Sequence, residues 1–183
     1  THMYIRQTTE TDEPLLIQVN LEAFGQQHGP EVAKLVKDLL HDATARPMFS
    51  LAAENDGELV GHVLFSRAEL ENAHEQLSVR ILAPLAVLPA HQSTGVGTLL
   101  ISRGLDMLRR EGVDLVFVLG HPDYYPRSGF EPAGVLGLEA PYPIPDKDAD
   151  AWMVQQLRPG ILGIVQGTVR CCDALDRPEH WRE

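Results

Sequence analysis

The sequence has few cysteines, an excess of acidic over basic residues, and no long apolar run. Its two cysteines, Cys171 and Cys172, are adjacent, so they neither close a chain loop nor have the spacing of a metal site. Cysteine scarcity favours a reducing compartment, and we expect a cytoplasmic protein without a metal. No apolar stretch approaches the ~18 residues of a membrane span, and the N-terminus does not resemble a secretion signal. These absences predict a protein with no membrane partner.

Basic residues are outnumbered by acidic ones. Lysine and arginine total 15 against 26 aspartate and glutamate residues, which gives a formal net charge of −11. Such a charge disfavours nucleic acid and anionic membranes as partners, because both repel an acidic surface. A neutral or cationic substrate fits this field better.

The chain length of 183 residues suits a single domain with its own hydrophobic core. We expect one domain over residues 3–183, with Thr1 and His2 as the remnant of an expression tag in front of Met3. There is no internal repeat, and the pattern leaves open whether the protein forms a homodimer.

Hydrophobic periodicity and turn signals predict an alternation of short strands and helices. We expect helices over residues 11–24, 31–41 and 97–111, a turn at 28–30, a short helix within 122–129, a loop over 139–150, and strands over 4–7, 49–54, 58–66, 76–87, 115–119, 151–157 and 166–172. Asn55-Asp56-Gly57 predicts a hairpin turn between two of the strands. Pro84 predicts an interruption of ladder pairing. The fold class is therefore α/β, with a mixed sheet flanked by helices.

The strongest chemical signal is the loop Gln92-Ser93-Thr94-Gly95-Val96-Gly97, which opens a helix. The start of a helix presents backbone N–H groups without partners together with the positive end of the helix dipole, an arrangement that binds phosphate. Gly95 and Gly97 let the backbone approach a bulky anion closely. Hydroxyl donors are available from Ser93, Thr94 and Thr98. The glycines alone are equally compatible with a simple turn and packing point.

Two other phosphate motifs are missing. The sequence has no Gly-Lys-Ser/Thr, which excludes a Walker-type nucleotide loop, and no third glycine completes a dinucleotide-binding pattern after Gly97. The loop also follows several strands, where a Rossmann fingerprint would be unusual.

Three segments together resemble the GNAT superfamily of acyl-CoA-dependent N-acetyltransferases. Residues 92–97 match its Gln/Arg-x-x-Gly-x-Gly/Ala signature. Leu85-Ala86-Val87-Leu88-Pro89 is similar to the end of its fourth strand, and Tyr125-Pro126-Arg127-Ser128-Gly129-Phe130 to its Tyr-x-x-x-Gly-Phe segment. The resemblance extends from Tyr4 to Phe130, and the chain beyond Gly134 is less diagnostic.

The resemblance implies a mostly antiparallel sheet whose fourth and fifth strands splay apart to admit acetyl-CoA. Leu85, Ala86 and Val87 then correspond to the positions that pair with the pantetheine arm, and a backbone N–H in this region can stabilise the developing oxyanion. The residues implied for the pyrophosphate are Gln92, Ser93, Thr94, Gly95, Val96, Gly97 and Thr98.

The activity that the resemblance implies is transfer of the acetyl group of acetyl-CoA to a primary amine by direct attack in a ternary complex, with coenzyme A as product. The acceptor is a small-molecule or peptide amine. Tyr125 corresponds to the family's acid near the departing sulfur. A tyrosine hydroxyl, with an ordinary pKa of ~10, is a weaker acid than a thiol at ~8.5, so hydrogen bonding to the thiolate is its main expected contribution. Packing is the alternative role, as it is for the neighbouring Tyr124.

The general base is where the sequence departs from familiar members of the family, which often carry a glutamate on the fourth strand. Residues 80–85 contain no carboxylate. His121 could act through a water, and Glu22 is a second candidate, but a structural histidine and a surface carboxylate are the alternatives, and we predict neither as catalytic. Two other function classes stay open: a non-catalytic acyl-CoA-binding or sensing module, and a binder of a different phosphate ligand.

Overall fold

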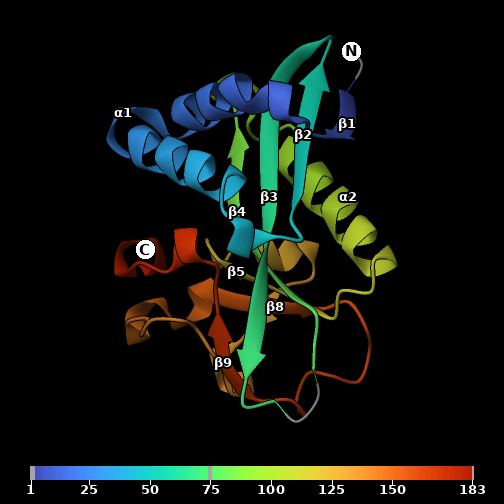
Figure 1. Cartoon of the computed structure of the whole chain (residues 1–183), viewed down its shortest axis with the longest axis vertical. Helices are drawn as coiled ribbons and strands as arrows, with labels where there is room; N and C mark the ends of the chain where they lie inside the picture. The colour runs from blue at the N-terminus through green and yellow to red at the C-terminus, as the bar shows by residue number, and fades with distance from the viewer. Residues whose placement is uncertain (1–2, 74–75, 183) are drawn as a thin grey trace.

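The computed structural model describes residues 3–73 and 76–182, and the predicted tag remnant at residues 1–2 lies outside them. Within the described residues, a nine-stranded mixed sheet forms the centre of the molecule (Figure 1). The strands are β1 (Met3–Gln7), β2 (Phe49–Asn55), β3 (Glu58–Glu71), β4 (Val79–Val87), β5 (Leu115–Leu119), β6 (Glu131–Pro132), β7 (Leu138–Glu139), β8 (Trp152–Gln156) and β9 (Gly167–Arg170). The helices are α1 (Glu13–Leu40) and α2 (Val96–Arg110), with short 3-10 turns between elements.

The strand order is β1-β2-β3-β4-β5-β8-β6, with β9 paired to the end of β3 and β7 paired to β9. Neighbouring strands run antiparallel except for the pairs β4–β5 and β7–β9, which are parallel. The predicted mixed, mostly antiparallel sheet flanked by helices is therefore confirmed.

The hairpin between β2 and β3 forms at the predicted turn. Asp56 and Gly57 both adopt left-handed backbone conformations, with φ angles of 52° and 84°, as a two-residue hairpin turn requires. β3 extends to Glu71, beyond the predicted end at residue 66, because residues 69–71 pair with β9. That partner lies a hundred residues further along the chain, so local pattern could not indicate the extension.

The predicted turn at residues 28–30 is wrong, because these residues are helical. α1 is interrupted at Gly25 (φ 73°, ψ −176°), as predicted, but the chain returns to a helix immediately afterwards. Gly29 permits this, since a side chain there would collide with the carbonyl of Leu21. Pro30 lies near the beginning of the second helical segment, close to the N–H groups that lack intrahelical partners in any case.

The two helices cover opposite faces of the sheet (Figure 1). Along β3, His62 contacts Asn20 of α1, whereas a side chain at the neighbouring Gly61 would meet Leu100 of α2. α2 approaches the sheet closely at Gly104, where the ring of Phe65 occupies the space that a side chain would need. The absence of a side chain at Gly104 thus lets α2 lie close to the strands.

The chain after β5 completes the lower part of the sheet. Trp152 of β8 stacks on Phe117 of β5, with ring centroids 5.0 Å apart, and meets Trp181 edge-on at 5.6 Å. These contacts join the C-terminal segment to a second group of buried side chains. None of the helices in the described part of the chain combines the length and apolar character of a membrane span.

Candidate functional site

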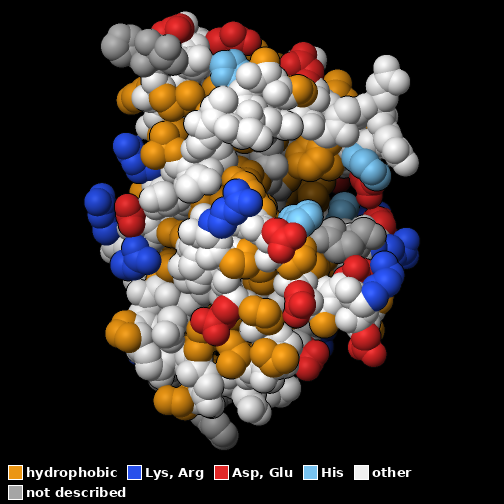
Figure 2. Space-filling model, turned by 180° about the vertical axis from the view of Figure 1, so that it is seen from behind, with side chains coloured by type: hydrophobic (Ala, Val, Ile, Leu, Met, Phe, Trp, Pro, Cys, Tyr) orange, Lys and Arg blue, Asp and Glu red, His pale blue; other side chains and the backbone are white. Residues whose placement is uncertain are grey.

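The central feature of the site is the divergence of β4 from β5. The two strands pair in parallel from Val79 and Leu115 to Ile81 and Phe117. β4 then continues to Val87 alongside β3, whereas the end of β5 keeps only the partner on its other side, β8. The edge of β4 beyond Ile81 is thereby released from β5, which is the predicted splay. Figure 2, which shows the molecule from behind, reveals a central hollow with hydrophobic side chains on its floor and histidines beside it.

A bulge bends β4 within this released segment. Val63 of β3 lies opposite Leu85 and Phe65 lies opposite Leu82, so two residues of β4, including Pro84, face a single residue of β3. Bulges of this type increase local twist and redirect a strand. The irregularity predicted at Pro84 is confirmed.

The three predicted pantetheine-pairing residues follow the bulge directly. Ala86 is buried in the core, whereas Leu85 and Val87 are half-buried. The side chain of Leu85 reaches the first turn of α2, since a Cβ on Gly97 would lie 3.6 Å from Leu85 Cδ2. The end of β4 and the start of α2 therefore lie next to each other.

The loop before α2 has the backbone conformation of an anion site. Ser93 and Gly95 both have left-handed φ angles, 62° and 90°, and Gly95 is the N-cap of α2. In the described part of the chain, no side chain caps this helix. The N–H groups of its first turn are therefore available to a ligand at the positive end of the helix dipole.

Two of the predicted ligand-binding side chains instead hold the loop together in this structure. Gln92 Nε2 donates to the carbonyl of Val87 at 3.0 Å, and the Thr94 hydroxyl donates to the carbonyl of His91. The hydroxyl-bearing residues Ser93 and Thr98 are exposed. Gln92 thus ties the loop to the end of β4.

The segment after β5 brings two tyrosines to the same region. Tyr125 is 9% exposed, and its ring packs against Gly120 and edge-on against Phe130 at 5.8 Å. Tyr124 meets Tyr125 at right angles at 5.1 Å, and its hydroxyl lies where a Cβ on Gly97 would be. We interpreted Tyr124 from the sequence only as a packing residue, yet it is the tyrosine whose hydroxyl contacts the first turn of α2. Its position next to the motif tyrosine was the one available signal.

Comparison with known proteins identifies this arrangement. A family model described as an acetyltransferase (GNAT) domain matches residues 4–133. The chain belongs to the GNAT acetyltransferase family. The predicted family and the predicted acyltransferase class are therefore confirmed.

Similar proteins span nearly the whole GNAT chain. It is 44% identical over 173 residues to the uncharacterized N-acetyltransferase YjhQ of Escherichia coli K12, covering 94% of this chain and 93% of that protein. The crystal structure of the GNAT family N-acetyltransferase YhbS from Escherichia coli, in complex with CoA, superposes with a TM-score of 0.84 at 30% identity, covering 96% and 93% of the two chains. A GNAT family acetyltransferase from Brucella melitensis, in complex with acetyl-CoA, gives a TM-score of 0.75 at 29% identity, covering 96% and 99%.

The two candidate bases of this GNAT domain make local contacts. His121 is exposed, and its Nδ1 accepts the N–H of Asp123 at 3.1 Å, which shapes the turn after β5. Glu22 is exposed on α1 and accepts a hydrogen bond from Gln18 Nε2 at 2.8 Å. These contacts fit the structural alternatives given for both residues.

A buried histidine on β3 escaped the sequence analysis altogether. His62 is fully buried, with Nε2 2.8 Å from Ser50 Oγ and Nδ1 3.0 Å from Asn20 Nδ2. Asn20 Nδ2 also donates to the carbonyl of Leu16 at 2.8 Å, so His62 Nδ1 accepts and its Nε2–H donates to Ser50. Burial lowers the pKa of His62 to about 4. The Ser50 hydroxyl oxygen therefore accepts this hydrogen bond. In a nucleophilic Ser-His-Asn triad the serine would instead donate to the histidine, so these three residues are not arranged as such a triad.

Proposed function

We propose that this GNAT enzyme transfers the acetyl group of acetyl-CoA to a primary amine by direct attack within a ternary complex. The observation that carries the proposal is the divergence of β4 from β5 beside the uncapped start of α2. The binding of CoA and acetyl-CoA by the two similar solved proteins supports it.

The released edge of β4 supplies the first part of the cofactor site. Backbone groups of Leu85, Ala86 and Val87 pair with the pantetheine arm, as an added strand would. One of their N–H groups also stabilises the negative charge that develops on the carbonyl oxygen when the amine attacks. The residues of the loop from Gln92 to Thr98 hold the pyrophosphate, chiefly through backbone N–H groups.

The two tyrosines act at different points along this path. Tyr125 donates its hydroxyl hydrogen bond to the departing sulfur, which stabilises the thiolate as the carbon–sulfur bond breaks. Tyr124, against Gly97, contacts the cofactor where it passes the first turn of α2. The amine attacks in its neutral form, after its proton has passed to the solvent; residues 80–85 of β4 carry no carboxylate that could accept it.

Blocking the phosphate loop tests the cofactor site. Gly97→Glu adds bulk and negative charge at the start of α2, so acetyl-CoA affinity measured by calorimetry should fall at least about 100-fold. Val135→Glu is the matched control, because it adds the same charge at a side chain that is 86% exposed. Unchanged affinity in a folded Gly97→Glu variant would refute the site.

A smaller change separates cofactor access from local packing. A Cβ on Gly97 would collide with the Tyr124 hydroxyl but would lie 3.5 Å from Tyr124 Cζ, an ordinary contact. Gly97→Ala combined with Tyr124→Phe should therefore restore the thermal stability that Gly97→Ala alone loses. If the Cβ obstructs the cofactor, the double variant still binds acetyl-CoA weakly. Full recovery of affinity would assign the role of Gly97 to packing against Tyr124.

Tyrosine substitutions test the chemistry. Tyr125→Phe should lower kcat by about 10-fold or more while leaving acetyl-CoA affinity within about twofold. Tyr124→Phe should raise the KM for acetyl-CoA with a smaller effect on kcat. A Tyr125→Phe variant with full kcat would remove Tyr125 from the mechanism.

A CoA-release screen over small amines, peptide N-termini and lysine side chains identifies the acceptor, and mass spectrometry of the product locates the acetyl group. Acetyl-CoA should raise the melting temperature of the protein. Stabilisation without CoA release from any amine class would favour the acyl-CoA-binding module over the transfer reaction.

A further inference from the structure

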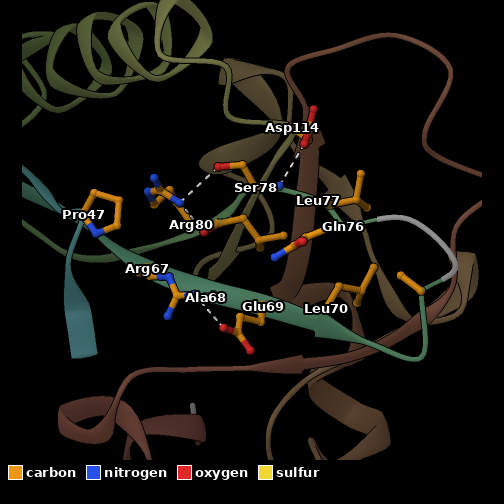
Figure 3. A pocket seen from close by; sticks show the side chains of 12 residues that line it. Pro47, Arg67, Ala68, Glu69, Leu70, Gln76, Leu77, Ser78, Arg80 and Asp114 are labelled. Atoms are coloured by element: carbon orange, nitrogen blue, oxygen red, sulfur yellow. Dashed lines mark hydrogen bonds and ion pairs between the residues drawn. The ribbon is translucent and has the colours of Figure 1, made fainter.

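A second pocket lies at the other end of β4, where this strand is still paired with β5 (Figure 3). Its volume is about 580 Å³, within the range of small-molecule sites. Arg80 and Asp114 line it, together with the apolar side chains of Pro47, Leu70 and Leu77. Val87 lies seven residues after Arg80 along β4, which is about 23 Å at ~3.3 Å per residue. The pocket is therefore distinct from the phosphate loop.

Arg80 is the unusual member of this pocket. The residue is 7% exposed, and its Nη1 donates to Ser78 Oγ at 3.3 Å and to the carbonyl of Val79 at 2.9 Å. Its Nε is buried without a hydrogen-bond partner. Among residues 3–73 and 76–182, no carboxylate oxygen lies within 4.0 Å of the guanidinium nitrogens. Arg80 is thus a buried cation without a counter-ion from the described chain.

Of the described residues, two carboxylates line the pocket, and both are directed to other groups. Glu69 pairs with Arg67 at 2.7 Å. Asp114 accepts from the backbone N–H of Ser78 and from Arg158 Nε, each at 2.8 Å. Figure 3 shows the same division, with Asp114 beyond Ser78 as seen from Arg80.

A second guanidinium lies next to Arg80. Arg67 is its cross-strand partner in the β3–β4 ladder, and both guanidinium groups lie on one side of the pocket in Figure 3. Burial, and then the positive charge of Arg67, lower the pKa of Arg80. Placing a buried cation beside a like charge is unfavourable unless an anion compensates it.

We propose that this pocket binds a small organic anion, whose carboxylate or phosphate oxygens accept hydrogen bonds from Arg80. The planar guanidinium has a fork geometry that suits both kinds of oxyanion, and its Nε–H has no partner among the described residues. The apolar side chains of Leu70, Leu77 and Pro47 contact the body of the ligand. The inference does not depend on the proposed transfer reaction, because it concerns the other end of the strand.

The test uses the whole protein with inorganic phosphate in one arm and succinate in the other, against sodium chloride at equal ionic strength. The direct readout is the Arg80 Nε–H resonance in a proton–nitrogen correlation spectrum, identified by its absence from Arg80→Lys. Saturable movement of this resonance in one arm supports the site and tells which oxyanion it prefers. Phosphate bound at the start of α2 would leave the resonance in place.

Arg80→Met tests the same site by calorimetry, with Arg109→Met as a matched control on an exposed arginine that pairs with Asp106. Arg80→Met should weaken binding by about tenfold or more, and its melting temperature without anion should equal or exceed that of the wild type, because an unpaired buried charge has been replaced by an apolar side chain. If Arg80→Met fails to fold, Arg80→Lys serves in its place. Anion binding that is absent, or equal in wild type and Arg80 variants, would overturn the proposal.

Discussion

Lowering the pH should destabilise this protein through His62, beginning above the pH at which carboxylates protonate. His62 is fully buried, and burial lowers its pKa to about 4, against ~6.5 in an unfolded chain. Between these values the unfolded chain binds a proton that the folded protein excludes. The free energy of unfolding therefore falls as the pH decreases from 6.5 towards 4, and it levels off below that.

The size of the effect follows from the two pKa values. Linkage gives a loss of about 3 kcal/mol over the whole range and roughly 2 kcal/mol at pH 5, a substantial part of the 5–15 kcal/mol typical of a domain. Asp12, whose charge acts on His62, stays ionised throughout, because the Arg6 guanidinium holds the pKa of its carboxyl well below the usual range. Burial also lowers the pKa of His180, so this second histidine must be tested separately.

Urea unfolding at pH 7.5, 6.5, 5.5 and 5.0 measures the effect, with His62→Gln and His180→Gln beside the wild type. His62→Gln should be less stable at pH 7.5, since it disturbs the bonds to Ser50 and Asn20, but its stability should change less between pH 6.5 and 5. His180→Gln serves as the control and should retain most of the pH dependence of the free energy of unfolding that the wild type shows. If the free energy of unfolding changes equally with pH in wild type and His62→Gln, then His62 is not the group that binds a proton only in the unfolded chain.

Two further substitutions test the packing and the charge pair. Asp12→Asn should lower the free energy of unfolding by about 1–3 kcal/mol at pH 7, because the carboxylate accepts from Arg6 at 2.8 and 2.9 Å and from the N–H of Thr9 at 2.7 Å. Because the pKa of Asp12 is depressed in the folded protein, the difference in stability between wild type and variant should shrink below about pH 3.8, towards the folded-state pKa. A difference that does not depend on pH would contradict the ionic account. Gly104→Ala should cost about 1–2 kcal/mol despite its better helix propensity, because its Cβ would collide with the ring of Phe65. Gly134→Ala, where a Cβ meets nothing within 4 Å, should stay within ~0.5 kcal/mol, and thermal unfolding that ranks the two glycine variants equally would refute the packing argument.

Local residue chemistry was sufficient to predict much of this protein. The Asp56-Gly57 turn tolerates left-handed backbone angles, the run from Leu115 to Leu119 is apolar throughout, and Pro84 cannot donate to a ladder. Each of these properties acts within a few residues, so the sequence predicted the hairpin, the strand at residues 115–119 and the interruption of pairing at Pro84. The phosphate loop at residues 92–97 was equally local, because its glycines and the helix after it are adjacent in the chain.

The tertiary structure alone decided which distant groups meet. The Tyr124 hydroxyl reaches Gly97, His62 joins Ser50 and Asn20 in a buried network, and Arg80 is enclosed without a counter-ion from the described residues. None of these contacts has a short-range signature, since each depends on strand register and on how the helices pack across the sheet. The sequence by itself therefore determined the family and the phosphate loop, whereas the packing determined the protonation of the core histidine and the pocket around Arg80.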